Sequence, residues 1–319
     1  MERSAGRAGS GSEARRAGVL ALDATALAHR AYHSTRGDDD AARPGIVTAV
    51  VASMLATVWD HGPYRAIAAA FDGPVNRRRQ LEPAYKAQRP PNPPDLAEHL
   101  ALLRSHLATA GFAVVVVEDA EADDVLVAVA DGCAERGLPC DVLSPDRDLT
   151  SVVGPGVRLL RPRQRFSDLS VEDEDAVREA YGIEAWQYTE LAALRGDPSD
   201  NLEGARGVGA RTAARLLRDH GSLAEVLAAI PDLPPRLAAA LREARGRIER
   251  NLLLMAPLAN LPVDIDAIVA DEHRPERLAE LVEGLGFPGA GRRLRRALEG
   301  PRPSPPPRPD PGSWPQPDE

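Results

Sequence analysis

Five short apolar runs, separated by stretches with helical periodicity, constrain this chain more than any other feature of its sequence. Each run has the length of a buried strand, and helical patterns lie between the first four. Alternation of strands and helices is typical of a parallel, doubly wound α/β sheet. The predicted strands cover residues 19–23, 66–72, 113–118, 140–144 and 157–160, and the helices between them cover residues 45–60, 95–109 and 122–136.

Acidic residues gather where most of these strands end. Asp23 closes the first run, Asp72 closes the second, and further acids follow the third and fourth. Because ligands of such sheets bind at the carboxyl ends of the strands, we expect these side chains to share one edge. Two unit charges roughly 4 Å apart interact by about 4 kcal/mol at an effective dielectric near 20, so clustered acids need a cation among them. The clustered acids are Asp23, Asp72, Glu121, Asp123, Asp124, Asp146, Asp148, Asp197 and Asp200.

These clusters indicate a metal site. All-oxygen clusters suit hard cations such as Mg²⁺ or Mn²⁺ better than zinc. Helix capping is the alternative for a single pair such as Glu121 and Asp124, but it is a poor account of all the clusters together. His29 and His33 have a spacing that can hold zinc, but no HExxH motif accompanies them, and Arg30 between them is the better functional candidate.

The composition limits the partners and the compartment. The 319 residues allow one large domain or two smaller ones, and the net charge of −9 means that any nucleic-acid contact must come from local basic patches. No stretch approaches the roughly 18–20 apolar residues of a membrane span, and the first residues lack the apolar region of a secretory signal. Cys133 and Cys140 match no zinc spacing and indicate a reducing cytosol.

A basic segment follows Asp72. It contains Arg77, Arg78 and Arg79, and then Tyr85 to Arg89, which includes the single lysine of the chain, Lys86. A compact ammonium differs chemically from a guanidinium, so Lys86 is a candidate for a specific role, although its chance survival in an arginine-rich chain is an alternative. Beside a metal site, the segment is best interpreted as a clamp on substrate phosphates, with a solvated basic loop as the alternative.

A glycine-rich turn supplies a second strong signal. Gly207 and Gly209 flank Val208 and open an amphipathic helix. Glycine lets backbone N–H groups approach a phosphate, and a helix N-terminus adds partial positive charge. This pattern predicts a helix–hairpin–helix that grips a DNA backbone without reading its sequence, and the alternative is an ordinary turn. Arg206, Arg211 and Arg215 extend the same face, and Thr212 belongs to the same segment.

From about residue 170 the sequence becomes mostly helical. We expect disordered tails at residues 1–17, which are rich in Gly, Ser and Arg, and at residues 300–319, which are rich in Pro. The predicted helices cover residues 171–181, 186–195, 208–219, 222–229, 234–254 and 275–285.

Taken in order, these segments resemble the 5′-nuclease family, whose members include the N-terminal domain of bacterial DNA polymerase I, phage 5′-nucleases and eukaryotic flap endonucleases. No single segment is specific, but their combination is, and it covers roughly residues 18–290. The matching segments are Leu22-Asp23, Arg30-Ala31-Tyr32-His33, Phe71-Asp72, Arg77, Tyr85-Lys86, Arg89, Glu121-Ala122-Asp123-Asp124, Asp146-Arg147-Asp148-Leu149, Gly196-Asp197-Pro198-Ser199-Asp200-Asn201, Gly207-Val208-Gly209 and Thr212-Ala213.

The resemblance implies a fold and a set of roles. We expect a PIN-like, doubly wound, mainly parallel α/β domain over residues 18–170 with a helical arch at about 77–105, followed by a helical helix–hairpin–helix (H3TH) subdomain over residues 171–299. The first metal would be held, directly or through water, by Asp23, Asp72, Glu121, Asp123 and Asp124, and the second by Asp146, Asp148, Asp197 and Asp200. Catalytic roles would fall to Lys86, Arg77, Arg78 and Arg30, and DNA contacts to Tyr85, Arg89, Arg206, Gly207, Val208, Gly209, Arg211, Thr212 and Arg215, with a K⁺ ion at the hairpin.

The implied function is a structure-specific 5′→3′ exonuclease or flap endonuclease that hydrolyses DNA with two Mg²⁺ or Mn²⁺ ions. Its substrates would be 5′ flaps, nicks or free 5′ ends, met in DNA replication or repair. We expect a monomer in the cytoplasm, at the nucleoid and not at a membrane. It would be a stand-alone nuclease or a partner for a separately encoded DNA polymerase.

The chain departs from the pattern of the family in places, and three other protein classes are alternatives. Pro145 and Glu203 replace residues usual in the family, which affects the expected efficiency and not the ligand set. Asp146-Arg147-Asp148-Leu149-Thr150 also matches the nucleophile loop of haloacid-dehalogenase-type phosphatases, although that class places it on the first strand. A PIN-type ribonuclease shares the acids but normally lacks the arch and the hairpin, and a DNA-binding relative without metals is a third alternative.

Overall fold

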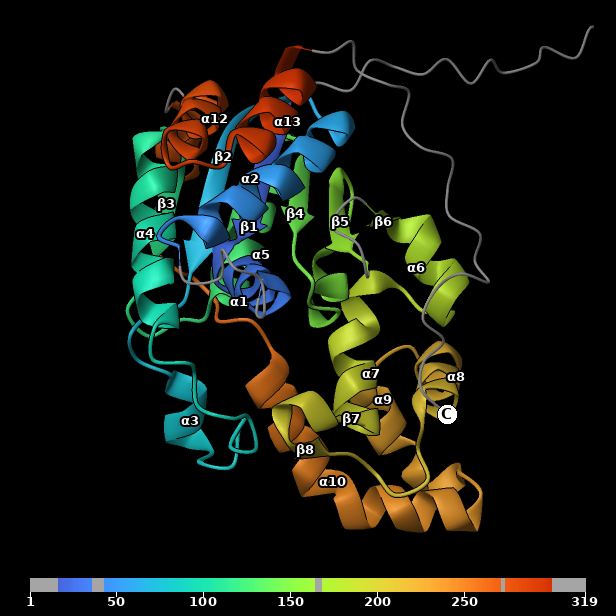
Figure 1. Ribbon diagram of the computed structural model, residues 1–319. Coiled ribbons are helices and arrows are strands. Elements are labelled where there is room, and N and C mark those ends of the chain that lie inside the picture. Colours follow the sequence, from blue (N-terminus) through green and yellow to red (C-terminus); the bar gives the residue numbers. More distant parts are fainter. Residues whose placement is uncertain (1–16, 36–42, 164–167, 271–272, 300–319) are drawn as a thin grey trace, which may run out of the picture.

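A six-stranded sheet forms the centre of the molecule, with the order β3-β2-β1-β4-β5-β6. The computed structural model describes residues 17–35, 43–163, 168–270 and 273–299 (Figure 1). The first five strands are parallel, and β6 joins β5 in antiparallel orientation. They are β1 (Gly18–Asp23), β2 (Tyr64–Phe71), β3 (Ala113–Val116), β4 (Cys140–Leu143), β5 (Val157–Pro162) and β6 (Leu169–Glu172). The doubly wound parallel sheet expected from the sequence is confirmed.

Helices cover both faces because side chains alternate along each buried strand. Leu20 and Leu22 pack with helices of one face, whereas Val19 and Ala21 pack with α5 on the other. The first face carries α1 (Ala24–Thr35), α2 (Ile46–Val58) and α4 (Leu96–Thr109), and the second carries α5 (Ala122–Glu135).

Two elements of this layer were not anticipated from the sequence. Helix α1 follows β1 directly, and its buried Leu27, Ala28 and Ala31 have the spacing of one helical face. Strand β6 occupies Leu169–Glu172, where a helix was expected to begin at residue 171. The helix α6 (Glu174–Tyr181) begins only after Asp173, whose side chain caps it by accepting from Ala176 N.

The chain between β2 and α4 leaves the sheet and crosses in front of its acidic edge. This crossing segment, residues 72–95, contains the short α3 (Arg77–Leu81) and a run of turns (Figure 1). The arch expected at residues 77–105 is therefore shorter than predicted. Its second half belongs to α4, because Leu96, Leu103 and Leu107 are buried against the sheet.

A separate helical unit lies beyond the carboxyl edge of the sheet. It has its own apolar core, which includes Leu194, Val208 and Leu241. Its elements are α7 (Tyr188–Arg195), β7 (Gly196–Asp197), β8 (Leu202–Glu203), α8 (Ala210–His220), α9 (Leu223–Ala228) and α10 (Pro235–Met255).

The last helices return to the sheet and do not join this unit, contrary to the expected subdomain over residues 171–299. Helix α11 (Ile265–Ala270) packs beside α5, while α12 (Pro275–Gly284) and α13 (Pro288–Glu299) cover α2 (Figure 1). The physical reason is that Leu278, Val282 and Leu294 complete the core of the first face. The helices α11 and α13 were also not predicted.

The two tails expected to be disordered, residues 1–17 and 300–319, lie outside the described residues except for Ala17. Among the helices described here, none combines the length and the apolar character that a bilayer crossing requires.

The return of α12 generates a stability prediction. Leu278 is fully buried in the core of the first face, so Leu278→Ala should lower the free energy of unfolding by about 2–5 kcal/mol. The matched control is Leu253→Ala, which removes the same atoms from a side chain that is 67% exposed and should change stability by no more than about 0.5 kcal/mol. Chemical denaturation measures both, and equal effects would contradict the packing.

Candidate active site

The sheet brings acids from distant parts of the sequence to one cleft. The cleft has a volume of ≈ 920 Å³ and lies at the carboxyl edge, between α1 and the crossing segment. One wall is acidic and contains Asp23, Asp72, Glu121, Asp123 and Asp146. The other charged or titratable side chains that line the cleft come from two elements: Lys86, Arg79 and Arg89 from the crossing segment, and His29 and His33 from α1. A lining that combines acids with basic side chains suits a phosphate held between bound cations and those basic groups.

The inner acids are joined through Ser144, which follows β4. Its hydroxyl donates to Asp23 Oδ2 at 2.6 Å and accepts from Asp146 N at 3.0 Å. Asp23 is buried, and burial, together with the charges of Asp72 and Asp146, raises its pKa to about 7. Burial and the neighbouring Asp23 and Asp146 also raise the pKa of Asp123 well above its usual range. These carboxylates therefore lie close enough to oppose each other's ionisation.

Asp72 stands at the end of β2 and is held by the start of α5. Its Oδ1 accepts from Ala122 N at 2.8 Å, and its own N–H donates to Thr25 Oγ1. The next residue, Gly73, passes so close to the strand-end backbone that an added Cβ would lie 2.1 Å from Val117 O. Only glycine fits there without moving the backbone, and this close passage directs the chain from Asp72 into the crossing segment.

A second group of acids adjoins Asp146. Burial, followed by the charges of Asp146, Asp197 and Asp200, raises the pKa of Asp148 well above its usual range. Among the described residues, Asp148 Oδ1 and Asp197 Oδ2 are buried and accept no hydrogen bond. Arg195 Nη2 lies 4.0 Å from that Asp197 oxygen. Buried carboxylate oxygens without donors are costly, and a cation would offset that cost.

The acids of the cleft are near one another, but their side chains are not oriented toward a common point. Within the described ranges, no group of three or more His, Cys, Asp or Glu side chains is arranged as a metal-binding set. Three of the carboxylates instead contact cationic side chains of the crossing segment: Glu121 with Lys86, Asp124 with Arg78, and Asp200 with Arg89.

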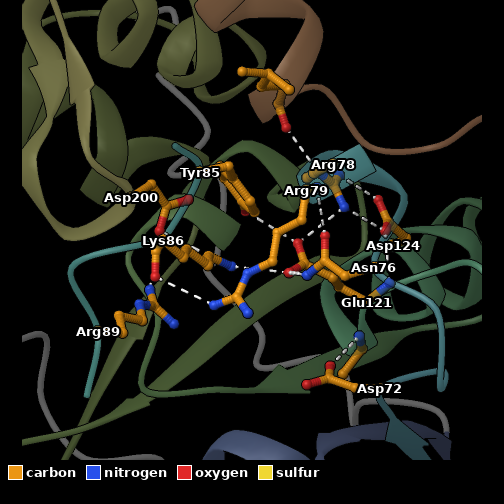
Figure 2. Close-up of polar contacts among 12 residues, drawn as sticks. Asp72, Asn76, Arg78, Arg79, Tyr85, Lys86, Arg89, Glu121, Asp124 and Asp200 are labelled. Atoms are coloured by element: carbon orange, nitrogen blue, oxygen red, sulfur yellow. Dashed lines mark hydrogen bonds and ion pairs between the residues drawn. The ribbon is translucent and has the colours of Figure 1, made fainter. Parts of the chain in front are cut away.

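Lys86 contacts the acidic wall directly. Its Nζ lies 3.1 Å from Glu121 Oε1 and 3.9 Å from Asp200 Oδ1 (Figure 2). Burial alone disfavours its charge, but the charges of Glu121 and Asp200 outweigh burial and raise the pKa of Lys86. The backbone at Lys86 is left-handed, with φ of 53°. This unusual conformation for a residue with a side chain is held by Lys86 N, which donates to Asp200 O at 3.0 Å.

The loop that carries Lys86 is bonded to the turn between β7 and β8 in the helical unit. Gln88 Nε2 donates to Pro198 O and Ser199 O, and Arg89 Nη2 donates to Asp200 Oδ1 at 2.9 Å. Arg89 was predicted to contact DNA, and in the structure it both lines the cleft and holds an acid of the second group.

Tyr85 does not occupy the place predicted for it. A DNA contact was expected, but Tyr85 is only 2% exposed, and its ring packs with Leu202 and Leu254. Its hydroxyl donates to Glu121 Oε2 at 3.1 Å. The side chain is buried because it lies where the crossing segment, β8 and α10 meet.

The arginines of α3 divide by environment, although they are adjacent in sequence. Arg78 points inward and forms a bidentate pair with Asp124, with both Nη–Oδ distances at 2.7 Å. Arg77 lies on the outer side, 3.7 Å from Asp119, and does not line the cleft. Arg79 was not among the predicted site residues, yet it lines the cleft and donates to Lys86 O.

The predicted roles of Arg78 and Asp124 need correction. Asp124 is fully buried, and its carboxylate also accepts from Glu121 N and Leu258 N. With Arg78 on both oxygens, its acceptor positions are filled by the protein, so it is unsuited to a metal in this arrangement. Arg78 is likewise enclosed by protein acceptors and unsuited to contact a phosphate.

Arg30 is held by main-chain carbonyls at the end of β5. Its Nη1 donates to Pro162 O at 3.3 Å, and its Nη2 donates to Arg163 O. These bonds tie α1 to the edge of the sheet. Both bonds go to main-chain carbonyls, and the catalytic role expected for Arg30 stays a prediction.

The hairpin before α8 has the predicted form. Gly209 is the N-cap of α8, and Gly207 has φ of 76°. Both are exposed, and a Cβ added at either would meet no atom within 4 Å, so the backbone there is accessible. Val208 between them is buried, while Arg211 and Arg215 are exposed on α8. Arg206 is exposed beside Gly207, and Thr212 is partly buried on α8.

Sequence reasoning missed three residues that shape the site. Asn76 caps α3 and donates to Glu121 Oε1, and a cap signal of Asn before a short polar helix could have found it. Ser144 directly follows a strand, but a lone serine carries no signal. Arg79 differs from Arg77 only by the rotation of α3, which becomes visible once the start of that helix is known.

Comparison with known proteins is consistent with this geometry. The family model described as the 5′-3′ exonuclease, N-terminal resolvase-like domain matches residues 18–182, and the 5′-3′ exonuclease, C-terminal SAM fold matches residues 183–276. A "5′-3′ exonuclease" of Streptomyces coelicolor is 34% identical over 300 residues, which cover 88% of this chain and 98% of the relative.

Longer relatives and solved structures agree with it. The "DNA polymerase I" of Mycobacterium tuberculosis is 34% identical over 256 residues, which cover 76% of this chain but only 28% of the relative. The metal-bound T5 D15 protein has a TM-score of 0.61 at 18% identity, covering 88% of this chain and 98% of that one. The catalytic core of Rad2 in complex with DNA substrate has a TM-score of 0.57 at 13% identity, covering 89% and 92%. These two structural matches show a shared fold.

A family model that covers more than half of the chain and a relative matched over nearly its whole length establish the same assignment. The protein belongs to the 5′-3′ exonuclease family.

Proposed function

We propose that this protein is a structure-specific 5′→3′ exonuclease and flap endonuclease that hydrolyses DNA phosphodiesters with two divalent cations, Mg²⁺ or Mn²⁺. The observation that carries the proposal is the cleft whose acidic wall faces Lys86, Arg79 and Arg89. The names of relatives support it: one is a 5′-3′ exonuclease, and others are DNA polymerase I, which favours a role in replication or repair beside a DNA polymerase.

The residues present fit a pair of divalent cations. Asp148 and Asp197 each hold a buried oxygen without a hydrogen bond in the described structure, and burial beside other acids raises the pKa of Asp23. The solved T5 structures with bound metal ions support this assignment. One cation would be held by Asp23, Asp72, Glu121 and Asp123, and the other by Asp146, Asp148, Asp197 and Asp200.

Bound divalent cations supply positive charge that stabilises the attacking and leaving oxygens of a phosphodiester displacement and ease the deprotonation of water. The chain itself positions the substrate. Lys86 Nζ, held at the acidic wall by Glu121, neutralises negative charge that develops on the scissile phosphate. Arg79 and Arg89 line the same side of the cleft and attract the neighbouring phosphates.

The helical unit grips the duplex part of the substrate. Backbone N–H groups at Gly207 and Gly209 and the start of α8 suit a DNA phosphate, and a K⁺ ion would add charge there. Arg206, Arg211 and Arg215 extend this surface with exposed cations. Because phosphates are the same in every sequence, this contact sets position on the DNA and not base specificity.

The first test is the cleavage of a 5′-flap DNA. The wild type should release the flap in Mg²⁺ and show no cleavage in EDTA, and Asp146→Ala should abolish cleavage while the Kd for the flap stays within about threefold, because phosphate contacts supply the affinity. Asp266→Ala, which removes an exposed acid on α11, is the control and should cleave normally. Cleavage that persists in EDTA, or an inactive wild type, would reject the proposal.

The buried acids predict an unusual pH dependence in EDTA. The folded protein keeps the Asp23 proton up to about pH 7, whereas the unfolded chain loses it near pH 3.8. The folded state therefore binds more protons across this window, and the contribution of Asp23 to stability falls as pH rises through it. We expect Asp23→Asn to flatten the decline of Tm between pH 5 and 8.

Two comparisons complete this measurement. Mg²⁺ should raise the Tm of the wild type most at the upper end of the range, because the ionised acids bind it. Asp60→Asn changes an exposed acid far from the cleft and should leave the pH profile unchanged. An identical profile for the Asp23 variant would show that this carboxyl is not protonated in the folded protein.

The basic surface predicts a change in salt dependence. Arg211→Ala should weaken binding to flap DNA and reduce the slope of log K against log[salt] by about one unit, because one phosphate contact is lost. Arg296→Ala removes an exposed arginine from α13, at the other end of the molecule, and serves as the control (Figure 1). Titrations at several salt concentrations give both slopes, and equal slopes would place the duplex elsewhere.

A further inference from the structure

All five N–H donors of Arg78 are used, and they reach two other elements, the start of α5 and the end of α10. Figure 2 shows the contacts with Glu121 and Asp124. Nη1 and Nη2 donate to the two oxygens of Asp124, and Nη1 also donates to Glu121 Oε2 at 3.0 Å. Nε donates to Leu254 O at 2.6 Å, and Nη2 donates to Ala256 O at 3.0 Å. Arg78 thus joins the crossing segment, the start of α5 and the end of α10.

The contact with α10 uses a general property of helix ends. The last carbonyls of a helix have no partner within the helix and carry partial negative charge. Leu254 O and Ala256 O belong to this terminus, and a buried guanidinium there satisfies both. Burial disfavours the charge of Arg78, but the bonds and charges of Asp124 and Glu121 outweigh burial and raise its pKa. Arg78 therefore stays charged at 7% exposure.

Helix α10 is also bonded to the elements that precede the glycine turn of α8. Asn251, one turn before the end of α10, is buried and donates to Glu203 O at 2.8 Å and to Ala193 O at 3.3 Å. These bonds fix α10 to β8 and α7, the elements that precede the glycine turn of α8. The elements that precede the glycine turn are therefore bonded to the same helix whose end binds Arg78.

On the acidic wall, Glu121 is shared between Arg78 and the residues that carry the chemistry. Its Oε2 accepts from Arg78 and from Tyr85, while its Oε1 accepts from Lys86 Nζ and from Asn76. Arg78 and Lys86 thus share Glu121 as a common partner, one on each of its two oxygens.

We propose that Arg78 is a positioning residue that couples duplex binding by the helical unit to the placement of Glu121 and Lys86 in the cleft. The inference rests on the proposed function, because the duplex is taken to bind at the glycine turn and α8. Arg78 touches no substrate in this scheme. It makes the catalytic arrangement depend on whether double-stranded DNA is held at the hairpin.

The variant that tests this is Arg78→Lys. A lysine keeps the charge but lacks the planar fork that reaches Asp124, Glu121 and two carbonyls together. The direct readout is amide hydrogen exchange at Tyr85–Arg89, measured in EDTA with and without a duplex that carries a 5′ flap. We expect the duplex to slow exchange there in the wild type by about fivefold or more, the lower range of coupling between sites, and to have no such effect in Arg78→Lys.

Kinetics give a second readout. In Mg²⁺, the wild type should have a higher kcat on flaps with a long downstream duplex than on flaps with a truncated one. Arg78→Lys should reduce this ratio by a factor of about 5 to 150, the usual range of such coupling, while the Kd for the long-duplex flap changes little. A variant that lost kcat equally on both substrates would have only a structural defect, and that result would overturn the inference.

A matched control separates coupling from stability. Arg158 also forms a bidentate pair, with Asp141 at 2.9 and 2.8 Å, but at the start of β5, at the opposite end of the strands. Arg158→Lys should lower Tm and leave both the protection at Tyr85–Arg89 and the duplex ratio intact.

A second variant keeps the test valid if Arg78→Lys folds poorly. Asn251→Ala cuts the link between α10 and β8 without touching the acidic wall. It should also abolish the protection of Tyr85–Arg89 by duplex. Protection that persists in both variants would overturn the inference even if the enzyme cleaves flaps as proposed, whereas an inactive wild type with normal duplex protection would overturn the proposed function alone.

Discussion

Repulsion among carboxylates at one edge of the sheet is the constraint on which the rest of the structure depends. Burial and neighbouring acids raise the pKa of Asp23, Asp123 and Asp148. Ionisation of one of these carboxyl groups therefore disfavours ionisation of the others. The crossing segment, which leaves the sheet at Gly73 and ends at α4, places cationic side chains beside these acids and reduces their repulsion. Lys86 contacts Glu121 and Arg89 contacts Asp200, so the crossing segment is held in front of the cleft by the acids whose repulsion it reduces. The turn between β7 and β8 is held by the same segment, through Gln88 and the backbone of Lys86.

Much of this arrangement follows from the sequence, because strand ends and acids coincide. The five parallel strands, the acidic edge and the glycine turn before α8 were predictable from local patterns, since each rests on residues within a few positions of one another. The pairing of Arg78 with Asp124 was not predictable, because the partners are 46 residues apart and any arginine of α3 could have served. The burial of Tyr85 was missed for the same reason. Its neighbours Leu202 and Leu254 come from two other elements. Likewise, nothing in residues 275–299 indicates which surface their apolar face will cover.

Three adjacent arginines illustrate how a short helix separates functions. Successive residues of a helix point about 100° apart, so Arg77, Arg78 and Arg79 cannot share an environment. Arg77 lies beside Asp119 at the surface, Arg78 is enclosed by five acceptors, and Arg79 borders the cleft beside Lys86. The same side chain thus serves as a surface charge, an internal connection and a candidate phosphate ligand. Resemblance to a family identifies the segment as functional, but the direction in which each side chain leaves α3 decides the role of each arginine.

The return of α12 and α13 to α2 also bears on how the protein is made. The first face of the sheet is completed by Leu278, Val282 and Leu294, so α2 and α4 keep uncovered apolar surface until those residues have left the ribosome. Chains emerge and fold from the N-terminus onward, which means that the strands carrying the acids are synthesised long before they can be fully packed. The sheet that carries the acids is therefore fully covered only after the helical unit has been synthesised. A nascent chain carries the acids on a sheet whose first face still exposes apolar surface.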